Sequence, residues 1–186
     1  MTKDEVRAEA ARRLRFMREE EQASQSQSIQ KRLIHADFLK DVESVGCYLS
    51  WWGEVATDRI VSHVLDGGKH LAAPKFFPEE NVWKHALLSR PEEVTCNEWG
   101  VPEPASDQVI KGDNLDVIIV PGQAFDTSGQ RIGRGQGHYD ALLLGFKGLK
   151  VGLAFDFQVF ATLPAESHDI SMDYLVTSDR IYACRA

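Results

Sequence analysis

Residues 116–144 read DVIIVPGQAFDTSGQRIGRGQGHYDALLL, and this stretch decides the fold class of the chain. Val117 to Val120 form an uninterrupted β-branched run, which is typical of a strand covered on both faces. Residues 139–146 have helical character, and a connection rich in glycine and arginine joins them to the strand. A buried strand followed by a loop and a helix indicates an α/β domain.

Strands and helices alternate along the rest of the chain, as an α/β domain requires. Val6, Ala10, Leu14 and Met17 recur at helical spacing and predict a helix over 3–19. We therefore expect a single domain over 1–186 around a mostly parallel sheet. Further helices are predicted from Ser26 or Ser28 to Phe38 and over 60–65, and strands over 45–49, 70–73 (closed by Pro74), 82–88, 150–155 and 174–177, with 89–114 irregular.

Ligands of open parallel sheets gather at the carboxyl ends of the strands. This rule selects the loops after Leu49, after Ala73 and after Val120 as the expected binding region.

Composition excludes several classes of protein. The net charge of −7 argues against a general nucleic-acid binder, which needs a basic face for the phosphate backbone. No apolar run approaches the roughly 18 residues that would span a bilayer, and the first residues lack the apolar core of a secretory signal. The three cysteines are scattered and suggest neither a disulfide framework nor a zinc site. We expect a cytoplasmic protein that acts without nucleic acid or membrane.

The connection between the predicted strand and helix suits an anion. Glycine lets a backbone approach a ligand closely, and a helix start offers unpaired N–H groups. Arg131 and Arg134 add charge-assisted contacts to phosphate, and Asp140 is a carboxylate of the kind that Mg²⁺ uses beside phosphates. The glycines concerned are Gly122, Gly129, Gly133, Gly135 and Gly137.

The two common nucleotide motifs are absent from this connection. A P-loop needs a lysine and a hydroxyl residue after its last glycine, and none follows here. A dinucleotide fingerprint needs a third glycine where His138 stands. The sequence therefore predicts a phosphate site of a different kind.

The stretch VPGQAFDTSGQRIGRGQGHYDALL resembles the signature of the 5-formyltetrahydrofolate cyclo-ligase family, a strand followed by PGxxFDxxGxRxGxGxGYYDxxL. Further family motifs are similar in the same order. They are KxxxR at Lys3 and Arg7, LSxxxE at Leu49, Ser50 and Glu54, GIPEP at 100–104 after Trp99, and HDxPMD at 168–173.

The resemblance implies a three-layer α/β/α domain and an ATP- and Mg²⁺-dependent ligase that cyclises 5-formyltetrahydrofolate to 5,10-methenyltetrahydrofolate. It implies catalytic roles for Arg131 and Arg134, and Mg²⁺ at Asp140 and Asp169. The implied ATP-binding residues are Lys3, Arg7, Arg131, Gly133, Arg134, Gly135, Gln136, Gly137, His138 and Tyr139. The implied folate-binding residues are Leu49, Glu54, Arg134, Gly135, Gln136, Gly137 and His138.

Among the departures from the family pattern, three bear on the acceptor substrate. His138 stands where tyrosine is usual, Gln136 where glycine or lysine is usual, and Ala56 where aspartate is usual. All three belong to the implied folate side, so two alternatives stay open. One is an enzyme that uses the same ATP site on another formyl or amide acceptor, and the other is a non-catalytic module that binds an anionic metabolite. The sequence predicts no oligomeric state.

Overall fold

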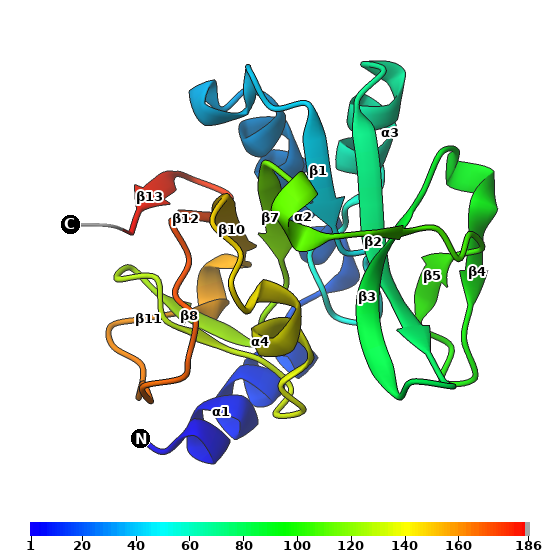
Figure 1. Ribbon diagram of the computed structural model, residues 1–186. Coiled ribbons are helices and arrows are strands. Elements are labelled where there is room, and N and C mark those ends of the chain that lie inside the picture. Colours follow the sequence, from blue (N-terminus) through cyan, green and yellow to red (C-terminus); the bar gives the residue numbers. More distant parts are fainter. Residues whose placement is uncertain (185–186) are drawn as a thin grey trace.

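An eight-stranded sheet forms the centre of the computed structural model, which describes residues 1–184 (Figure 1). Its strands are β1 (Ser44–Cys47), β2 (His70–Phe77), β3 (Val82–Leu87), β6 (Val109–Ile110), β7 (Val117–Val120), β10 (Leu149–Leu153), β12 (Tyr174–Val176) and β13 (Ile181–Ala183). The order is β13-β12-β10-β7-β1-β2-β3-β6. Neighbours from β12 to β2 pair in parallel, and the outer strands pair antiparallel. The predicted α/β class and mostly parallel sheet are confirmed.

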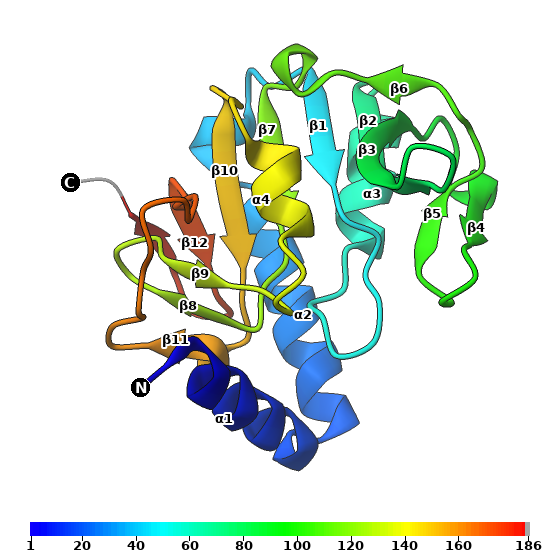
Figure 2. The same ribbon diagram turned by 60° about the horizontal axis from the view of Figure 1, so that its bottom comes forward.

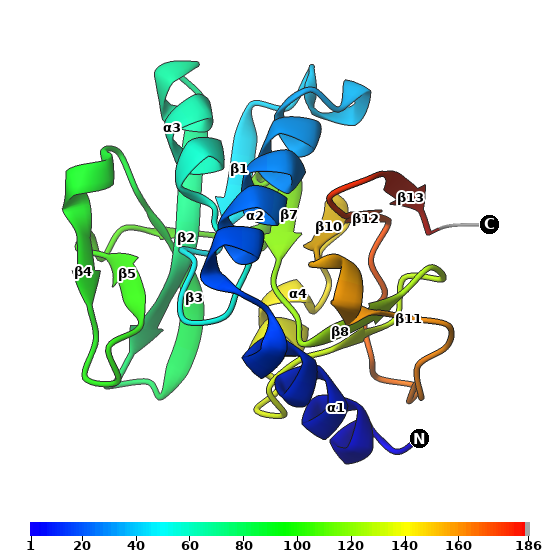
Figure 3. The same ribbon diagram turned by 180° about the vertical axis from the view of Figure 1, so that it is seen from behind.

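Strand β7 is buried on both faces, as its β-branched run predicts. Val117 and Ile119 belong to the core formed with α2 (Glu19–Ile34) and α3 (Asp58–Asp66). Ile118 and Val120 belong to the core on the opposite face, with Leu143 of α4 (His138–Leu143). Figures 1 and 3 show α2 and α3 on one face of the sheet and α4 on the other.

A smaller sheet lies below the carboxyl end of β7 (Figure 2). It contains β8 (Ala124–Asp126), β9 (Arg131–Ile132) and β11 (Val159–Phe160), in the order β11-β8-β9. The hairpin of β8 and β9 lies inside the connection that the sequence predicts as a plain loop. That expectation is wrong because these two- and three-residue strands depend on partners elsewhere in the chain.

The buried carboxylate of Asp126 holds this hairpin together. One oxygen accepts hydrogen bonds from Ser128 N (3.0 Å), Ser128 Oγ (2.6 Å) and Gln130 N (3.1 Å). The other accepts from Leu163 N (2.9 Å). The carboxylate thus fixes the turn before Arg131 and ties it to a segment more than thirty residues away.

Helix α1 (Lys3–Phe16) packs against the same hairpin and begins with a capping box. Thr2 Oγ1 accepts from Glu5 N, and Glu5 Oε2 accepts from Thr2 N. Lys3 and Arg7 lie one turn apart near this fixed start, so their positions are well defined.

The second predicted helix begins earlier and ends earlier than expected. It runs over Glu19–Ile34, and Phe38 lies in a short 3₁₀ helix, Asp37–Leu39. Three glutamates in its first turn suit the positive end of the helix dipole. Ser26 does not cap a helix; its hydroxyl accepts from Ala56 N, while Gln30 Oε1 accepts from Arg59 N and Ile60 N at the start of α3.

Strand β2 continues through Pro74 to Phe77, although the sequence predicts its end at Pro74. The pairing with β1 ends at Ala72, so the missing N–H of Pro74 removes no ladder bond on that side. The segment 89–114 is also more regular than expected. It contains β4 (Val94–Cys96), β5 (Pro102–Pro104), β6 and 3₁₀ helices Pro91–Glu93 and Gly112–Asn114. The fourth 3₁₀ helix is Asp156–Gln158.

Helix α4 ends at Leu143, three residues before the predicted end. Gly145 follows with a φ of 77°, in the left-handed region that favours glycine. Within residues 1–184, no helix is long and apolar enough to cross a lipid bilayer.

We predict that Asp126→Asn lowers the free energy of unfolding by about 1–3 kcal/mol, because an NH₂ group would then face buried N–H donors. Urea denaturation measures this change. Asp113→Asn is the matched control, since Asp113 is exposed, and it should leave the midpoint unchanged. Equal midpoints for both variants would contradict the role of Asp126.

Candidate functional site

A cavity of about 1020 Å³ opens at the carboxyl ends of β1, β2 and β7. Its wall includes Leu49 after β1, Phe76 of β2, and Pro121 and Gly122 after β7. The segments that the sequence selects by the strand-end rule therefore line one cavity, although the residues after Ala73 continue β2 and do not form a loop. Single-ligand pockets measure roughly 300–1,000 Å³. This one lies at the upper end of that range, so it accommodates a large ligand.

Every residue that the family resemblance implies for ATP, folate or Mg²⁺ lines this one cavity, whereas Gly129 of the glycine segment lies against Met172 instead. The implied residues come from α1, from the loop after β1, from the glycine–arginine segment and from the segment before β12. The residues are Lys3, Arg7, Leu49, Glu54, Arg131, Gly133, Arg134, Gly135, Gln136, Gly137, His138, Tyr139, Asp140 and Asp169.

Arg131 places a buried positive charge at the end of β7. Its guanidinium donates to Pro121 O (3.4 Å) and to Asp140 Oδ1 (3.1 Å), and lies 5.7 Å from the centre of the Tyr139 ring. A β-carbon at Gly133 would lie 2.7 Å from Arg131 Nη1, so glycine makes room for the guanidinium. The cation is held in place before any ligand binds.

Helix α1 brings two further cations to the same end of the cavity. Arg7 Nε donates to Gly133 O (2.9 Å), which joins the helix to the glycine loop. Lys3 Nζ donates to both oxygens of Asp169, at 2.7 and 2.8 Å. Burial opposes the effect, but the Lys3 ammonium and the Glu166 N–H hold the pKa of Asp169 below its ordinary value.

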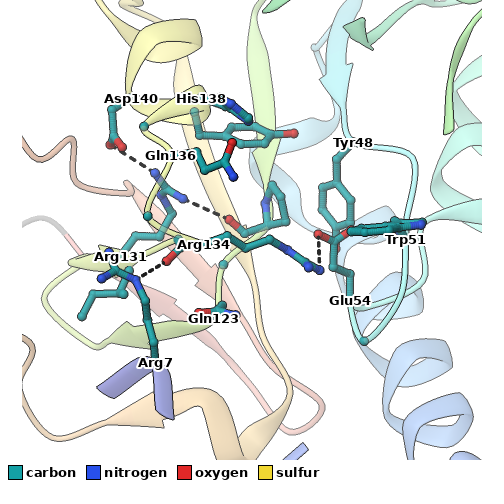
Figure 4. A pocket seen from close by; sticks show the side chains of 18 of the residues that line it. Arg7, Tyr48, Trp51, Glu54, Gln123, Arg131, Arg134, Gln136, His138 and Asp140 are labelled. Carbon is teal, nitrogen blue, oxygen red and sulfur yellow. Dashed lines mark hydrogen bonds and ion pairs between the residues drawn. The ribbon is translucent and has the colours of Figure 1, made fainter. Parts of the chain in front are cut away.

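Arg134 crosses from the glycine loop to the loop after β1 (Figure 4). Its Nη2 donates to Trp52 O (3.0 Å) and lies 3.5 Å from Glu54 Oε1, and its Cζ lies 4.9 Å from the centre of the Trp51 ring. Glu54 Oε2 also accepts from Trp51 N (2.9 Å). Burial raises the pKa of Glu54 above its ordinary value despite Arg134.

Aromatic rings form the opposite wall of the cavity. His138 lies 5.2 Å from Trp83, Trp83 lies 5.6 Å from Phe76, and Phe76 lies 5.0 Å from Trp99, measured between ring centres. Partial burial lowers the pKa of His138 below its ordinary value. The chain contains four tryptophans, and all of them line this cavity. Such a wall suits flat, apolar rings.

Three buried polar atoms of residues that line the cavity have no partner among residues 1–184. They are Gln123 Oε1, Arg131 Nε and Tyr139 Oη. Buried polar groups in proteins are nearly always hydrogen-bonded. Arg32 Nε and His85 Nε2, which belong to residues that do not line the cavity, are buried without a partner in the described chain as well, so such atoms are concentrated at the cavity but not confined to it.

Several lining residues were missed by the sequence reasoning, and Gln123 and Trp83 show why. Gln123 stands at a variable position of the glycine-segment motif, and Trp83 stands in a strand without a motif. Only the pairing of β2 with β3, which places Trp83 beside Phe76, reveals the aromatic wall.

The two carboxylates proposed for a metal both contact cations, Asp140 with Arg131 and Asp169 with Lys3. Within residues 1–184, no three side chains of histidine, cysteine, aspartate or glutamate gather as a metal site. Mg²⁺ in nucleotide sites is typically held by one or two carboxylates together with phosphates and water. Asp140 fits that kind of site, since Arg131 contacts only its Oδ1.

Comparison with known proteins agrees with the geometry. The model of the 5-formyltetrahydrofolate cyclo-ligase family matches residues 1–178. The 5-formyltetrahydrofolate cyclo-ligase of Escherichia coli K12 is 31% identical over 91% of this chain and 97% of its own, and that of Mus musculus is 28% identical over 94% and 92%.

Solved structures show the same relation. The structure of 5,10-methenyltetrahydrofolate synthetase from Aquifex aeolicus superposes with a TM-score of 0.88 at 34% identity, covering 100% of this chain and 94% of that one. A synthetase from Mycoplasma pneumoniae shares the fold at 17% identity, with a TM-score of 0.78 over 96% of this chain and 100% of that one. The chain therefore belongs to the 5-formyltetrahydrofolate cyclo-ligase family.

Proposed function

We propose that this chain cyclises 5-formyltetrahydrofolate to 5,10-methenyltetrahydrofolate with ATP, releasing ADP and phosphate. The observation that carries the proposal is a single cavity with a cationic end, an aromatic wall, and Arg134 between them. A reaction that transfers a phosphoryl group to a ring-bearing substrate needs this arrangement. A cytoplasmic location stays a prediction.

The cationic end is assigned to ATP. Lys3, Arg7 and Arg131 supply positive charge, and the loop from Gly133 to Tyr139 supplies backbone N–H groups. Gly135 and Gly137 have φ values of 96° and 69°, which a side chain would strain. This backbone can lie close to the phosphates.

The aromatic wall and the loop after β1 are assigned to the reduced folate. Glu54 accepts hydrogen bonds from pterin amino and ring N–H groups, and Leu49 packs beside them. His138, Gln136 and the glycines of the loop complete the folate side near Arg134. Glu54 is suited to this role because its carboxylate is largely shielded from water.

Asp140 would hold Mg²⁺ together with the phosphates. Asp169 is the second candidate ligand and would have to exchange its contact with Lys3. When bound, Mg²⁺ neutralises phosphate charge and orients the transferred group.

The chemical difficulty is that a formyl oxygen is a poor leaving group. Transfer of the γ-phosphoryl group to that oxygen gives an iminium phosphate, which the neighbouring nitrogen attacks before phosphate departs. The chain has to position the two substrates and neutralise charge, and it needs no nucleophile of its own. Arg131 is fixed beside the phosphates, and Arg134 reaches both substrates.

One assay tests the proposal. Purified protein is mixed with Mg-ATP and 5-formyltetrahydrofolate, and the absorbance of the methenyl product is followed. Growth of that absorbance supports the proposal. ATP hydrolysis that requires a different formyl or amide acceptor would instead support the first alternative, and ATP binding without turnover of any acceptor would support a binding module.

We predict that Arg134→Ala lowers kcat by about 10²–10³-fold, the usual effect of removing one preorganised charge contact. Circular dichroism should show an unchanged fold, since Arg134 lies at the surface of the cavity. Arg59→Ala is the matched control, because Arg59 is exposed on α3. A fully active Arg134→Ala enzyme would refute its role.

We predict that folate affinity falls as the pH drops through the raised pKa of Glu54, about tenfold per unit below it. The sign follows because protonation removes the negative charge and turns one acceptor oxygen of Glu54 into an O–H donor that faces the pterin N–H groups. A raised pKa means that this protonation begins at a higher pH than for an exposed glutamate. Glu54→Gln should bind folate more weakly near pH 7 and lack this dependence. Fluorescence titration from pH 4 to 8 measures it, and persistence of the acid limb in Glu54→Gln would contradict the assignment.

A further inference from the structure

The motif at 99–104 contains a buried glutamate that does not line the cavity. Glu103 lies in β5, which pairs with β4 beside the outer part of β2. Its Oε2 accepts from Phe76 N (3.3 Å) and from Asn97 Nδ2 (3.2 Å). No ion pair of Glu103 occurs in the described part of the chain. The Glu103 carboxylate therefore serves as a hydrogen-bond acceptor for N–H groups and does not neutralise a cation of the described residues.

The two donors belong to the two segments that carry aromatic rings to the cavity. Phe76 is itself one of these rings. Asn97 begins the turn that carries Trp99, and Asn97 Oδ1 accepts from Trp99 N (3.1 Å) and Val101 N (3.0 Å). One carboxylate oxygen thus connects β2 to the turn at 97–101.

The Trp99 ring has little else to hold it. About half of its surface is exposed, and it meets Phe76 edge to face with ring centres 5.0 Å apart. Gly100 follows Trp99 with a φ of 75°, and a β-carbon at Gly100 would meet no atom of the described chain within 4 Å. No other segment of residues 1–184 therefore packs against the chain reversal at this glycine. Backbone hydrogen bonds from Asn97 N to Val101 O (3.0 Å) and from Gly100 N to Asn97 O (2.9 Å) close the turn. The side chain of Asn97, which Glu103 orients, adds the bond that holds the Trp99 N–H itself.

We infer that Glu103 is a positioning residue for the reduced-folate end of the cavity, acting through Asn97 on Trp99. The inference rests on the proposed function, because the flat rings of the folate are the ligand assigned to the aromatic wall. Glu103 has no part in ATP binding, since Lys3, Arg7 and Arg131 lie at the other end of the cavity.

The principal test is steady-state kinetics of Glu103→Ala. The KM for 5-formyltetrahydrofolate should rise about threefold to tenfold, the value of roughly one aromatic contact. The KM for ATP and kcat should not change. A merely structural role would lower the melting temperature or the active fraction and leave the KM for folate as it was.

Two further variants keep the test decisive if Glu103→Ala does not fold. Glu103→Gln retains an oxygen that accepts both N–H groups, so it should behave as the unmodified protein does. Asn97→Asp retains Oδ1 for the turn but loses the donor to Glu103 and sets two carboxylates together, so it should raise the KM for folate. Glu98→Ala is the matched control, because Glu98 is exposed in the same turn and should change nothing.

A double-mutant comparison tests the route through Trp99. In a Trp99→Ala background, Glu103→Ala should cause no further rise in the KM for folate. A further rise of the same size would overturn the inference. So would an unchanged KM for folate in folded Glu103→Ala and Asn97→Asp, and so would an equal rise in the KM for ATP.

Failure of the proposed function gives a different result. The unmodified protein would then show no turnover of 5-formyltetrahydrofolate. The placement of Trp99 is still tested by near-ultraviolet circular dichroism, where Glu103→Ala should change the tryptophan signal, and Glu98→Ala and Glu103→Gln should not. An unchanged signal in Glu103→Ala would overturn the inference independently of activity.

Discussion

The four residues of β7 must be covered on both faces, and much of the structure is a consequence of that requirement. Val117 and Ile119 need α2 and α3, and Ile118 and Val120 need Phe125 and Leu143. Covering the second face brings β8 and α4 to the carboxyl end of β7, and the segment between them has to pass over that end. Burial of an apolar strand thereby places Arg131 and the glycine loop where parallel strands bind their ligands.

The fold was predictable where the residues of a short stretch themselves favour the helix or strand that they form. The β-branched run at 117–120 predicted strand β7, and the helical spacing of apolar residues at 60–65 predicted helix α3. Both elements are of the predicted type, and their bounds are close to the predicted ones. Prediction failed where the reason lies elsewhere in the chain. The hairpin of β8 and β9 needs Asp126 bonded to Leu163 N. The polar start of α2 over 19–25 lay outside the predicted helix, and it contains Gln25, whose Oε1 accepts from the distant Asp156 N. Local propensity contains no information on such partners.

The residues of the site fall into the same two groups, those that the sequence identifies and those that it misses. The residues of the glycine segment and of α1 were found from sequence, because a family motif and the chemistry of phosphate both select them. Trp83, Gln123 and the role of Glu103 were not found. Trp83 joins the wall only through the pairing of β2 with β3, and Glu103 acts through a turn that it does not belong to. The motif at 100–104 contains Glu103, but a motif does not say through which neighbour a residue acts.

The cavity is also where the chain satisfies its own groups least well. Burial raises the pKa of Glu54, and Gln123 Oε1, Arg131 Nε and Tyr139 Oη are buried without partners among residues 1–184. Each such group costs stability, on the order of 1–3 kcal/mol for an unpaired buried donor or acceptor. A chain selected for stability alone would fill these positions with apolar side chains, as it does around β7. Three of the five unpartnered buried side-chain atoms in residues 1–184 belong to residues that line this one cavity, which is the pattern expected where a chain is selected for a binding site and not for packing alone.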